Sequence, residues 1–487
     1  MDRLSAATLA QAQGATVPAY DRAAVTPGIV HLGIGAFHRG HMAIYVDDLL
    51  GEAPDWGIIG ASLRRPDTRD ALAPQDFLYT VAIRDGAGSQ CRIIGSILDV
   101  IDANAERERL LETMADPRIR IVSLTVTEKG YCHDPATGAL DEAHPDIVHD
   151  LAHPASPISA PGLIVAALEL RRQRGHKAFT VMSCDNLPAN GQTAGRIVRR
   201  LAALMGPEVA AYAETAGFPS TMVDRIVPAT TDADRAEVAE TTGLEDAWPI
   251  MTEPFTQWVV EDDFPAGRPA FEAAGARLVH DVEPFELMKL RMLNGSHSTI
   301  AYLGYLAGHQ YVSAAVNDDA IRKLVHGLMT EEVMPTLPMA REELEAYRDR
   351  LLERFLNPAL KHRTWQIAMD GSQKLPQRLL GTIRDRLAHN AGIERLSLGV
   401  AGWMRYVTGV DEAGQPIEVK DPMVGRLQQI AAKAGGDAQT LATGLMQVSE
   451  IFGTELPADA RFRDAVTGHL AGLLRDGAAA TIRRVVG

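Results

Sequence analysis

Residues 28–50 read GIVHLGIGAFHRGHMAIYVDDLL, and they predict how the N-terminal part of the chain folds. Residues 29–34 are mostly branched and apolar, which is typical of a buried parallel strand. Gly33 and Gly35 allow a tight turn at the end of this strand, and residues 41–50 then carry apolar side chains at helical spacing. A strand, a glycine turn and a helix in this order are typical of the first unit of a dinucleotide-binding domain.

The segments that follow strengthen this interpretation, which the turn alone supports weakly because His38 stands at the third glycine of the GxGxxG pattern. Buried strands and amphipathic helices alternate, and such alternation predicts an α/β fold with a doubly wound parallel sheet of the Rossmann type. Ligands of such sheets bind beyond the carboxyl ends of the strands. The expected strands are residues 56–63, 120–126 and 178–183, and the expected helices are residues 105–114 and 163–174.

The character of the sequence changes near residue 285, where strand patterns become rare and long amphipathic helical patterns begin. We therefore expect a dinucleotide-binding domain over residues 1–284 and a mostly α-helical substrate-binding and catalytic domain over residues 285–487. The expected helices of the second domain are residues 287–308, 318–329, 341–355, 422–433 and 459–486.

Composition excludes several classes of protein. Acidic residues outnumber basic ones by 63 to 48, so the formal net charge of −15 disfavours nucleic acid and anionic membranes as partners. The three cysteines, Cys91, Cys132 and Cys184, form no CxxC pair, which argues against a structural zinc site and fits a reducing cytoplasm. The N-terminal residues lack the apolar core of a signal peptide, so a cytoplasmic location is expected. No coiled-coil pattern is visible, and we expect a monomer or a weak dimer.

The segment FELMKLRMLNGSHSTIAYLGYL, residues 285–306, contains the strongest candidate for catalysis. On an α-helix, Lys289, Asn294 and His297 fall within an arc of about 140°, so the three side chains could line one cavity. Apolar neighbours disfavour a charged ammonium, and a lysine in such a place can act as a general base. An asparagine amide can stabilise a developing oxyanion, and a histidine can orient the reacting oxygen. The alternative is a lysine that extends into solvent and a histidine that belongs to the core.

Several motifs together resemble the signatures of the mannitol dehydrogenase family, the polyol-specific long-chain dehydrogenases. The motifs are HLGIGAFHRGHMAIYVDDLL, IVSLTVTEKGYC, FTVMSCDN, TMVDRIVPAT, KLRMLNGSH, MDGSQKLPQR and LGVAGWMRY, which run in the family's order from residue 31 to residue 406. Within the family, the sequence is most similar to the enzymes that interconvert D-mannonate and D-fructuronate. The resemblance implies a hydride transfer between NAD and a secondary alcohol that needs no zinc or other metal.

The resemblance also implies a role for individual residues. Lys289 would be the general base, Asn294 and Asn186 would stabilise the oxyanion, and His297 would bind the reacting oxygen. Glu286 would relay protons to solvent, and Asp224 and Lys374 would contact the substrate. The residues expected along the cofactor are Gly33, Gly35, Ala36, Phe37, Asp67, Thr125 and Glu128.

Two short segments bear on the choice of cofactor and of substrate. Arg64 and Arg65 favour NADP and Asp67 favours NAD, so the local sequence leaves the cofactor open while the family implies NAD. Mannitol-oxidising members of the family carry arginine eight residues before the lysine of the DGSxK motif, where this sequence has Gln366. That difference favours a sugar acid over mannitol.

Arg363 and Arg378 are the candidates to bind the carboxylate of such an acid, since arginine pairs with carboxylates in a bidentate way. Two other functions stay open. The first is a polyol dehydrogenase for mannitol, arabinitol or sorbitol. The second, from a different class, is a nucleotide-sensing binding protein without catalysis, which would have no use for Lys289.

Overall fold

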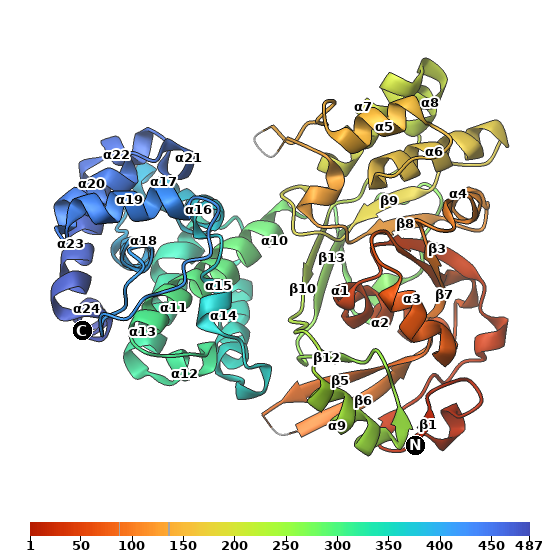
Figure 1. Cartoon of the computed structure of the whole chain (residues 1–487), viewed down its shortest axis with the longest axis horizontal. Helices are drawn as coiled ribbons and strands as arrows, with labels where there is room; N and C mark the ends of the chain where they lie inside the picture. The colour runs from red at the N-terminus through yellow and green to blue at the C-terminus, as the bar shows by residue number, and fades with distance from the viewer. Residues whose placement is uncertain (87, 135–136) are drawn as a thin grey trace. The chain divides into compact units, whose positions relative to one another are not determined.

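The chain forms two compact units in a computed structural model, Met1–Glu283 and Pro284–Gly487. The structure describes residues 1–86, 88–134 and 137–487. Figure 1 shows the first unit as a mixture of strands and helices and the second as helices alone. The expected fold class, a Rossmann-type sheet domain followed by a mostly helical region, is confirmed.

A five-stranded parallel sheet forms the centre of the first unit, in the order β7-β4-β3-β8-β9. The chain adds β4 and β7 on one side of the central strand β3 and then β8 and β9 on its other side. This change of side is the topological switch point at which dinucleotides bind in such sheets. The strands are β7 (Ile97–Asp102), β4 (Gly57–Ser62), β3 (Pro27–Leu32), β8 (Ile121–Leu124) and β9 (Thr180–Ser183). The last four confirm the strands expected from the sequence, and β7 was not foreseen.

Successive side chains of β3 point to opposite faces of this sheet, and each face packs against its own hydrophobic core. Val30 and Leu32 pack with α4 (Arg107–Ala115), α6 (Ala160–Gln173) and α7 (Asn190–Met205). On the opposite face, residues of β3 and β4 pack against α2 (Met42–Leu49) in a second core. The sheet is therefore covered on both faces, which explains why its strands read as nearly continuous apolar runs.

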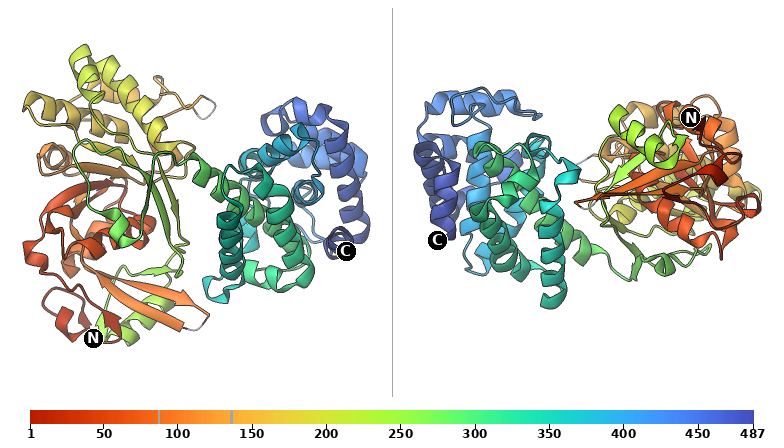
Figure 2. Two further views of the ribbon diagram at one scale, coloured as in Figure 1. Left: turned by 180° about the vertical axis from the view of Figure 1, so that it is seen from behind. Right: turned by 90° about the horizontal axis from the view of Figure 1, so that it is seen from below.

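Further strands of the first unit carry no signal that the sequence analysis recognised. A four-stranded sheet has the order β12-β5-β6-β2 and a three-stranded sheet the order β10-β13-β14. The β5–β6 hairpin extends from the unit in both views of Figure 2. These strands are β12 (Ile250–Thr252), β5 (Tyr79–Asp85), β6 (Gly88–Ile94), β2 (Ala15–Thr16), β10 (Thr221–Asp224), β13 (Gln257–Glu261) and β14 (Arg277–Val279), with β1 (Asp2–Arg3) pairing β11 (Leu244–Glu245). The remaining helices are α1 (Ala36–Gly40), α3 (Asp67–Leu72), α5 (Pro145–Ala152), α8 (Pro207–Ala213) and α9 (Asp232–Thr242).

Helices pack around α18 (Glu394–Tyr406) in the second unit. This helix contacts α11 (Gly295–Leu306) and α23 (Ala460–Asp476), and its Trp403 is fully buried. The other helices are α10 (Glu283–Met288), α12 (Val312–Asn317), α13 (Asp319–Gly327), α14 (Arg341–Leu356), α15 (Thr364–Ile367), α16 (Gly371–Leu375), α17 (Gly381–Ala388), α19 (Val424–Ala434), α20 (Ala438–Met446), α21 (Ser449–Phe452), α22 (Glu455–Ala458) and α24 (Ala478–Val486).

Two helices expected to be continuous are interrupted in the structure. Residues 459–486 form α23 and α24 with a break at Gly477, whose φ of 79° is in the region that glycine adopts readily. Residues 287–308 contain a π-helical segment, Lys289–Asn294, between α10 and α11. Two further π-helical segments, Leu328–Val333 and Pro376–Leu380, occur in this unit. Periodicity does not reveal such segments, because each is only about one turn long and contains too few residues to distinguish a π-helix from an α-helix.

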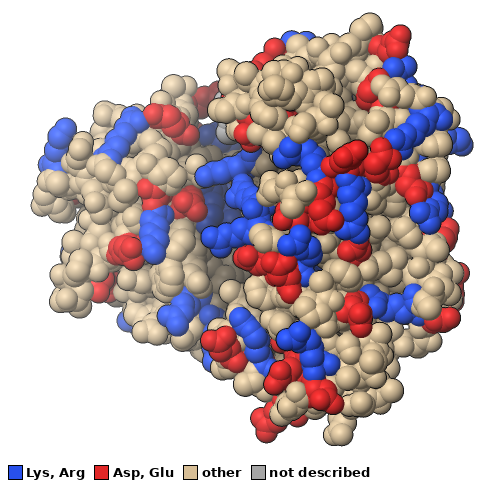
Figure 3. All heavy atoms as spheres, turned by 45° about the vertical axis from the view of Figure 1, so that its right-hand side comes forward, with Lys and Arg blue, Asp and Glu red and all other residues tan. Residues whose placement is uncertain are grey.

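Acidic and basic side chains are interspersed on the molecular face drawn in Figure 3. Many pair locally, as Arg268 does with Asp262 and Glu272. Within the described part of the chain, we find no helix with the length and apolar character needed to cross a bilayer.

Candidate active site

A tight turn joins β3 to α1 at the carboxyl edge of the five-stranded sheet. Gly33 has a φ of 91°, and a Cβ there would lie 2.3 Å from the carbonyl oxygen of Thr125, so only glycine fits. The amide of Gly35 donates to the carbonyl of Gly33 at 2.6 Å. Gly35 and Ala36 are exposed, and a Cβ on Gly35 would meet only the Gly33 carbonyl, at 3.7 Å. The turn therefore leaves room for a pyrophosphate to approach the backbone, as a dinucleotide requires.

The other cofactor candidates of the first unit follow neighbouring strands of this sheet, so they share its carboxyl edge. Asp67 is the first residue of α3, after β4, and lies 3.8 Å from Arg65. Thr125 follows β8, and its hydroxyl donates to the Gly33 carbonyl at 2.8 Å. Phe37 stacks on His41 with ring centroids 5.1 Å apart. Glu128 is exposed in the turn that follows β8, as the position of an expected cofactor contact requires.

Asp224 is the last residue of β10 in the first unit, and Asn186 lies in the loop that follows β9. Asn186 is exposed after β9, whereas Asp224 is buried at the end of β10. The sequence did not predict the structural role of Asp185, whose carboxylate accepts from the amides of Val126 and Thr127 and thereby ties the β8 edge to the β9 edge. Burial raises the pKa of Asp185, and the hydrogen bonds it accepts oppose that rise. The CDN sequence contained this aspartate, but nothing in it distinguished a loop anchor from a site residue.

The π-helical segment determines how the candidate catalytic residues of the second unit are arranged. Lys289 and Asn294 are its first and last residues, and His297 follows within the first turn of α11. A π-helix turns by roughly 80° per residue, so the arc spanned by the three side chains narrows from about 140° to about 60°. The π-turn therefore aligns the three groups more closely than the α-helix expected from the sequence. Lys289 and Asn294 are half-buried, and His297 is buried.

His297 lies among cationic and aromatic side chains. Its ring is 4.8 Å from that of Phe355 and 5.2 Å from that of His362, the second in an edge-on arrangement. Burial lowers the pKa of His297 well below its usual value, and His362, Arg354 and Arg378 lower it further. His297 is therefore neutral at physiological pH, and its Nε2 has no hydrogen-bond partner among the described residues. The hydrogen-bonding capacity of that nitrogen is therefore unused.

Arg378 and Lys374 lie on the two elements that follow the DGS motif. The Arg378 guanidinium donates to the Ser298 hydroxyl at 3.2 Å, next to His297. Burial lowers the pKa of Arg378, and among the described residues no carboxylate pairs with it. The Lys374 ammonium donates to the Met369 carbonyl at 2.6 Å. Burial lowers the pKa of Lys374, and the nearby charge of Arg378 lowers it further. The structure therefore brings the neutral His297 close to two cationic side chains, Arg378 and Lys374.

Arg363 does not belong to this region. Its side chain is exposed, and its guanidinium lies over the ring of Tyr311 at 5.6 Å. Gln366 is also exposed, on the short helix α15. Glu286, the expected proton relay, lies on α10 one turn before Lys289. His362 was not foreseen, because no motif in the sequence marks it and only its contact with His297 shows its relevance.

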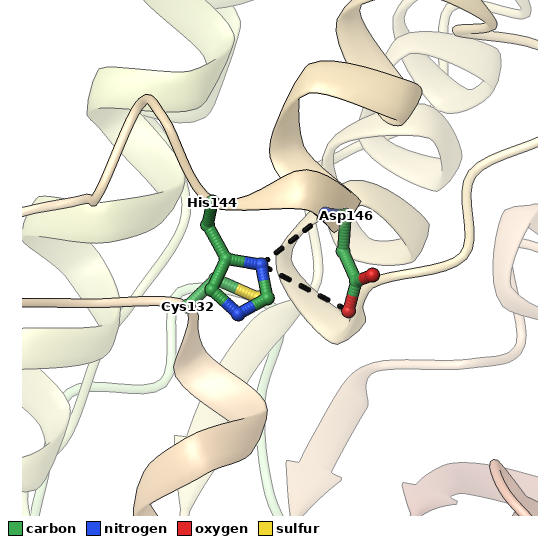
Figure 4. Close-up of side chains that lie close together, drawn as sticks. All are labelled: Cys132, His144 and Asp146. Carbon is green, nitrogen blue, oxygen red and sulfur yellow. Dashed lines mark hydrogen bonds and ion pairs between the residues drawn. The ribbon is translucent and has the colours of Figure 1, made fainter.

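One cluster of the described residues carries the side chains that bind metal ions, and it lies in the first unit. Cys132, His144 and Asp146 place one potential ligand atom each within 4.8 Å of one another (Figure 4). His144 Nδ1, however, accepts from the Asp146 amide at 3.2 Å and caps α5. Burial and neighbouring carboxylates raise the pKa of Cys132 to about 12, so its thiol is protonated. The helix cap accounts for the arrangement of His144 and Asp146, and we assign the cluster no role in catalysis.

The buried histidines predict a loss of stability in acid. Burial lowers the pKa of His31 to about 3 and that of His362 to about 4, below the value near 6.5 of an unfolded chain. The unfolded state therefore binds more protons below pH 6.5, and stability present above that pH is lost as the pH falls toward the folded values. Each histidine should cost about 1.4 kcal/mol per pH unit below 6.5.

Urea unfolding at pH 7.5 and pH 5.5 measures this effect, and His362→Asn is the comparison. The variant should lose less stability between the two pH values than the wild type. An equal loss in both proteins would show that His362 is not held neutral by the fold.

Both units match models of known protein domains. Residues 27–273 match the mannitol dehydrogenase Rossmann domain, and residues 281–474 match the mannitol dehydrogenase C-terminal domain. The chain is 49% identical to D-mannonate oxidoreductase of Escherichia coli over 95% of this chain and 96% of that protein. It is 43% identical to mannitol 2-dehydrogenase of Pyricularia oryzae over 96% of this chain and 95% of that protein.

Solved structures agree over the whole length. Mannitol 2-dehydrogenase of Pseudomonas fluorescens, in a ternary complex with NAD and D-mannitol, is 39% identical with a TM-score of 0.87, and the match covers 99% of each chain. A substrate-free D-sorbitol dehydrogenase is 34% identical with a TM-score of 0.91 over 99% of this chain and 100% of that one.

Proposed function

Because the chain belongs to the mannitol dehydrogenase family, an oxidoreductase family acting on CH–OH groups of polyols and sugar acids, we propose that it interconverts D-mannonate and D-fructuronate with NAD. The two candidate substrate classes differ at one place. D-Fructuronate is D-fructose with the hydroxymethyl group farthest from the ketone oxidised to a carboxylate. Selectivity for the acid therefore requires a cation at the far end of the bound chain.

Arg378 is the observation that carries this proposal. A buried guanidinium without a carboxylate partner is costly, and an anionic substrate would supply the missing charge. Its neighbours, Ser298 and His297, offer the ligand further polar groups. The higher identity to D-mannonate oxidoreductase than to mannitol 2-dehydrogenases, 49% against 43%, supports the same choice.

The chemistry follows from the residues of the π-turn. Oxidation removes a hydride from the carbon and a proton from its hydroxyl, and we assign the proton to the Lys289 amine as general base. The Asn294 amide donates to the oxygen as negative charge develops there, with Asn186 as the second amide donor. His297 Nε2 holds the same oxygen in place, and Glu286 passes the proton on. Asp224 and Lys374 contact the remaining hydroxyl groups.

The turn of the first unit fits the cofactor. Gly33, Gly35, Ala36 and Phe37 would hold the dinucleotide at the carboxyl edge of the sheet, where an exposed backbone faces the ligand. Asp67, after β4, would bind the ribose and select NAD over NADP. NAD, when bound, supplies the two-electron acceptor. No metal is needed, because Lys289 takes the proton and the two amides polarise the oxygen.

Oxidation rates with NAD test the proposal. We expect kcat/KM for D-mannonate to exceed that for D-mannitol by about 30-fold or more, since a buried charge-assisted hydrogen bond contributes about 2–3 kcal/mol. Equal values, or a preference for D-mannitol, D-arabinitol or D-sorbitol, would favour a polyol dehydrogenase instead. Addition of a metal chelator should leave all rates unchanged.

A further inference from the structure

A chain of buried polar side chains lies beneath the glycine turn of the first unit. Ser123 Oγ is 2.8 Å from His31 Nδ1, and His31 Nε2 is 2.8 Å from Thr125 Oγ1. Thr125 Oγ1 in turn is 2.8 Å from the carbonyl oxygen of Gly33. His31 and Ser123 are fully buried on the adjacent strands β3 and β8. The chain of contacts therefore runs through the middle of the sheet and ends on the backbone of the turn.

The direction of these hydrogen bonds is fixed by their last member. A carbonyl oxygen only accepts, so Thr125 must donate its one hydroxyl proton to Gly33. Thr125 then accepts from His31 Nε2–H, which leaves Nδ1 of His31 bare to accept from Ser123. All three bonds point toward the Gly33 carbonyl, and hydrogen bonds aligned in this way strengthen one another. Burial holds His31 neutral, which this tautomer requires.

His38, a residue of α1, packs against His31. Its ring stacks on that of His31 with centroids 3.5 Å apart and an angle of 18° between the planes. His38 occupies the third position of the GxGxxG pattern, where glycine normally lets the helix approach the strand. Here two stacked imidazoles fill that space. Both ring nitrogens of His38 are buried and have no partner among the residues that the structure describes, so it acts through packing.

We propose that Ser123, His31 and Thr125 form a positioning relay that fixes the Gly33 carbonyl, and with it the turn that binds the pyrophosphate of the dinucleotide. The Gly33 carbonyl accepts from Thr125 and from the Gly35 amide together, at 2.8 and 2.6 Å. These two bonds determine how the peptides of the turn are oriented toward the ligand. Thr125, expected along the cofactor, thus acts through Gly33 instead of touching the dinucleotide.

Thr125→Val tests the relay, because it removes the hydroxyl and keeps the shape of the side chain. We expect the Kd of NADH, measured by titration calorimetry, to rise about tenfold, since small displacements of binding groups have large effects. Thr125→Ser restores the hydroxyl and should bring the Kd back within about threefold of wild type. The matched control is Thr180→Val, a buried threonine of β9 whose hydroxyl has no partner among the described residues.

Binding of ADP-ribose shows which part of the cofactor the variant affects. This ligand keeps the pyrophosphate and lacks the nicotinamide, so Thr125→Val should weaken ADP-ribose and NADH by the same factor. At saturating NADH, the KM for the sugar should not change. If Thr125→Val does not fold, Ser123→Ala interrupts the relay at its far end and should raise the Kd about threefold. Wild-type affinity in Thr125→Val or Ser123→Ala, or an equal loss in Thr180→Val, would overturn the proposal.

Discussion

Replacing Lys289 with alanine is expected to lower kcat about 1,000-fold, because a positioned general base contributes about 10²–10⁴-fold to such a proton transfer. Lys289 begins the π-turn that also carries Asn294, and the next helix carries His297. Loss of the amine removes the proposed acceptor of the hydroxyl proton while the amides stay in place. The Kd of NADH and the KM for the sugar should therefore stay within a few-fold of wild type. Initial rates and calorimetric titration measure the two quantities separately.

A matched control is Lys323→Ala, an exposed lysine of α13 that pairs with Asp319. It should leave every kinetic constant unchanged. A kcat of Lys289→Ala within a few-fold of the wild-type value would show that Lys289 is not the base. The π-turn would then fit a binding protein without catalysis better.

Replacing Arg378 with methionine is expected to raise the KM for D-fructuronate about 30- to 100-fold and that for D-fructose less than about threefold. The guanidinium is buried beside Ser298 and His297, and no carboxylate among the described residues pairs with it. Removal of a charge-assisted hydrogen bond in such a place costs about 2–3 kcal/mol, which corresponds to that change in affinity. D-Fructose lacks the carboxylate and has nothing to lose at this position.

Arg384→Met is the control for Arg378, since Arg384 lies on α17 and donates to the Phe452 carbonyl. Both variants remove a half-buried arginine from the same unit, so a change specific to Arg378 reports the site and not the loss of an arginine. Equal effects of Arg378→Met on the acid and on D-fructose would contradict a role in carboxylate binding.

The part of the fold built from consecutive strand–helix units was predictable from the sequence. The glycine turn after β3 and the strands β4, β8 and β9 gave a correct Rossmann-type interpretation, because buried parallel strands read as short apolar runs. The strands of the smaller sheets escaped notice. Most of these strands are short or pair with segments distant in sequence, so local pattern carries no record of the pairing. The hairpin of β5 and β6 joins adjacent segments, and its pattern was not recognised.

The sequence suggested candidate residues for the site but did not predict how they are arranged in space. Lys289, Asn294 and His297 were expected on an α-helix, and the π-turn between them has no signature in apolar periodicity. His362 and the His31 relay depend on contacts across elements, at 5.2 Å in one case and 2.8 Å in the other. The role of Arg363 in carboxylate binding stays a prediction, and the structure places its exposed side chain over Tyr311.

Deuterium labelling tests whether the protein transfers a hydride from NADH to a sugar acid. NADH carrying deuterium at the transferable position is mixed with D-fructuronate and the wild-type protein, and the product is examined by NMR. We expect D-mannonate with deuterium on the carbon that was the ketone, formed in equal amount to NAD. Absence of labelled D-mannonate under conditions in which D-fructose is reduced would contradict the proposed function.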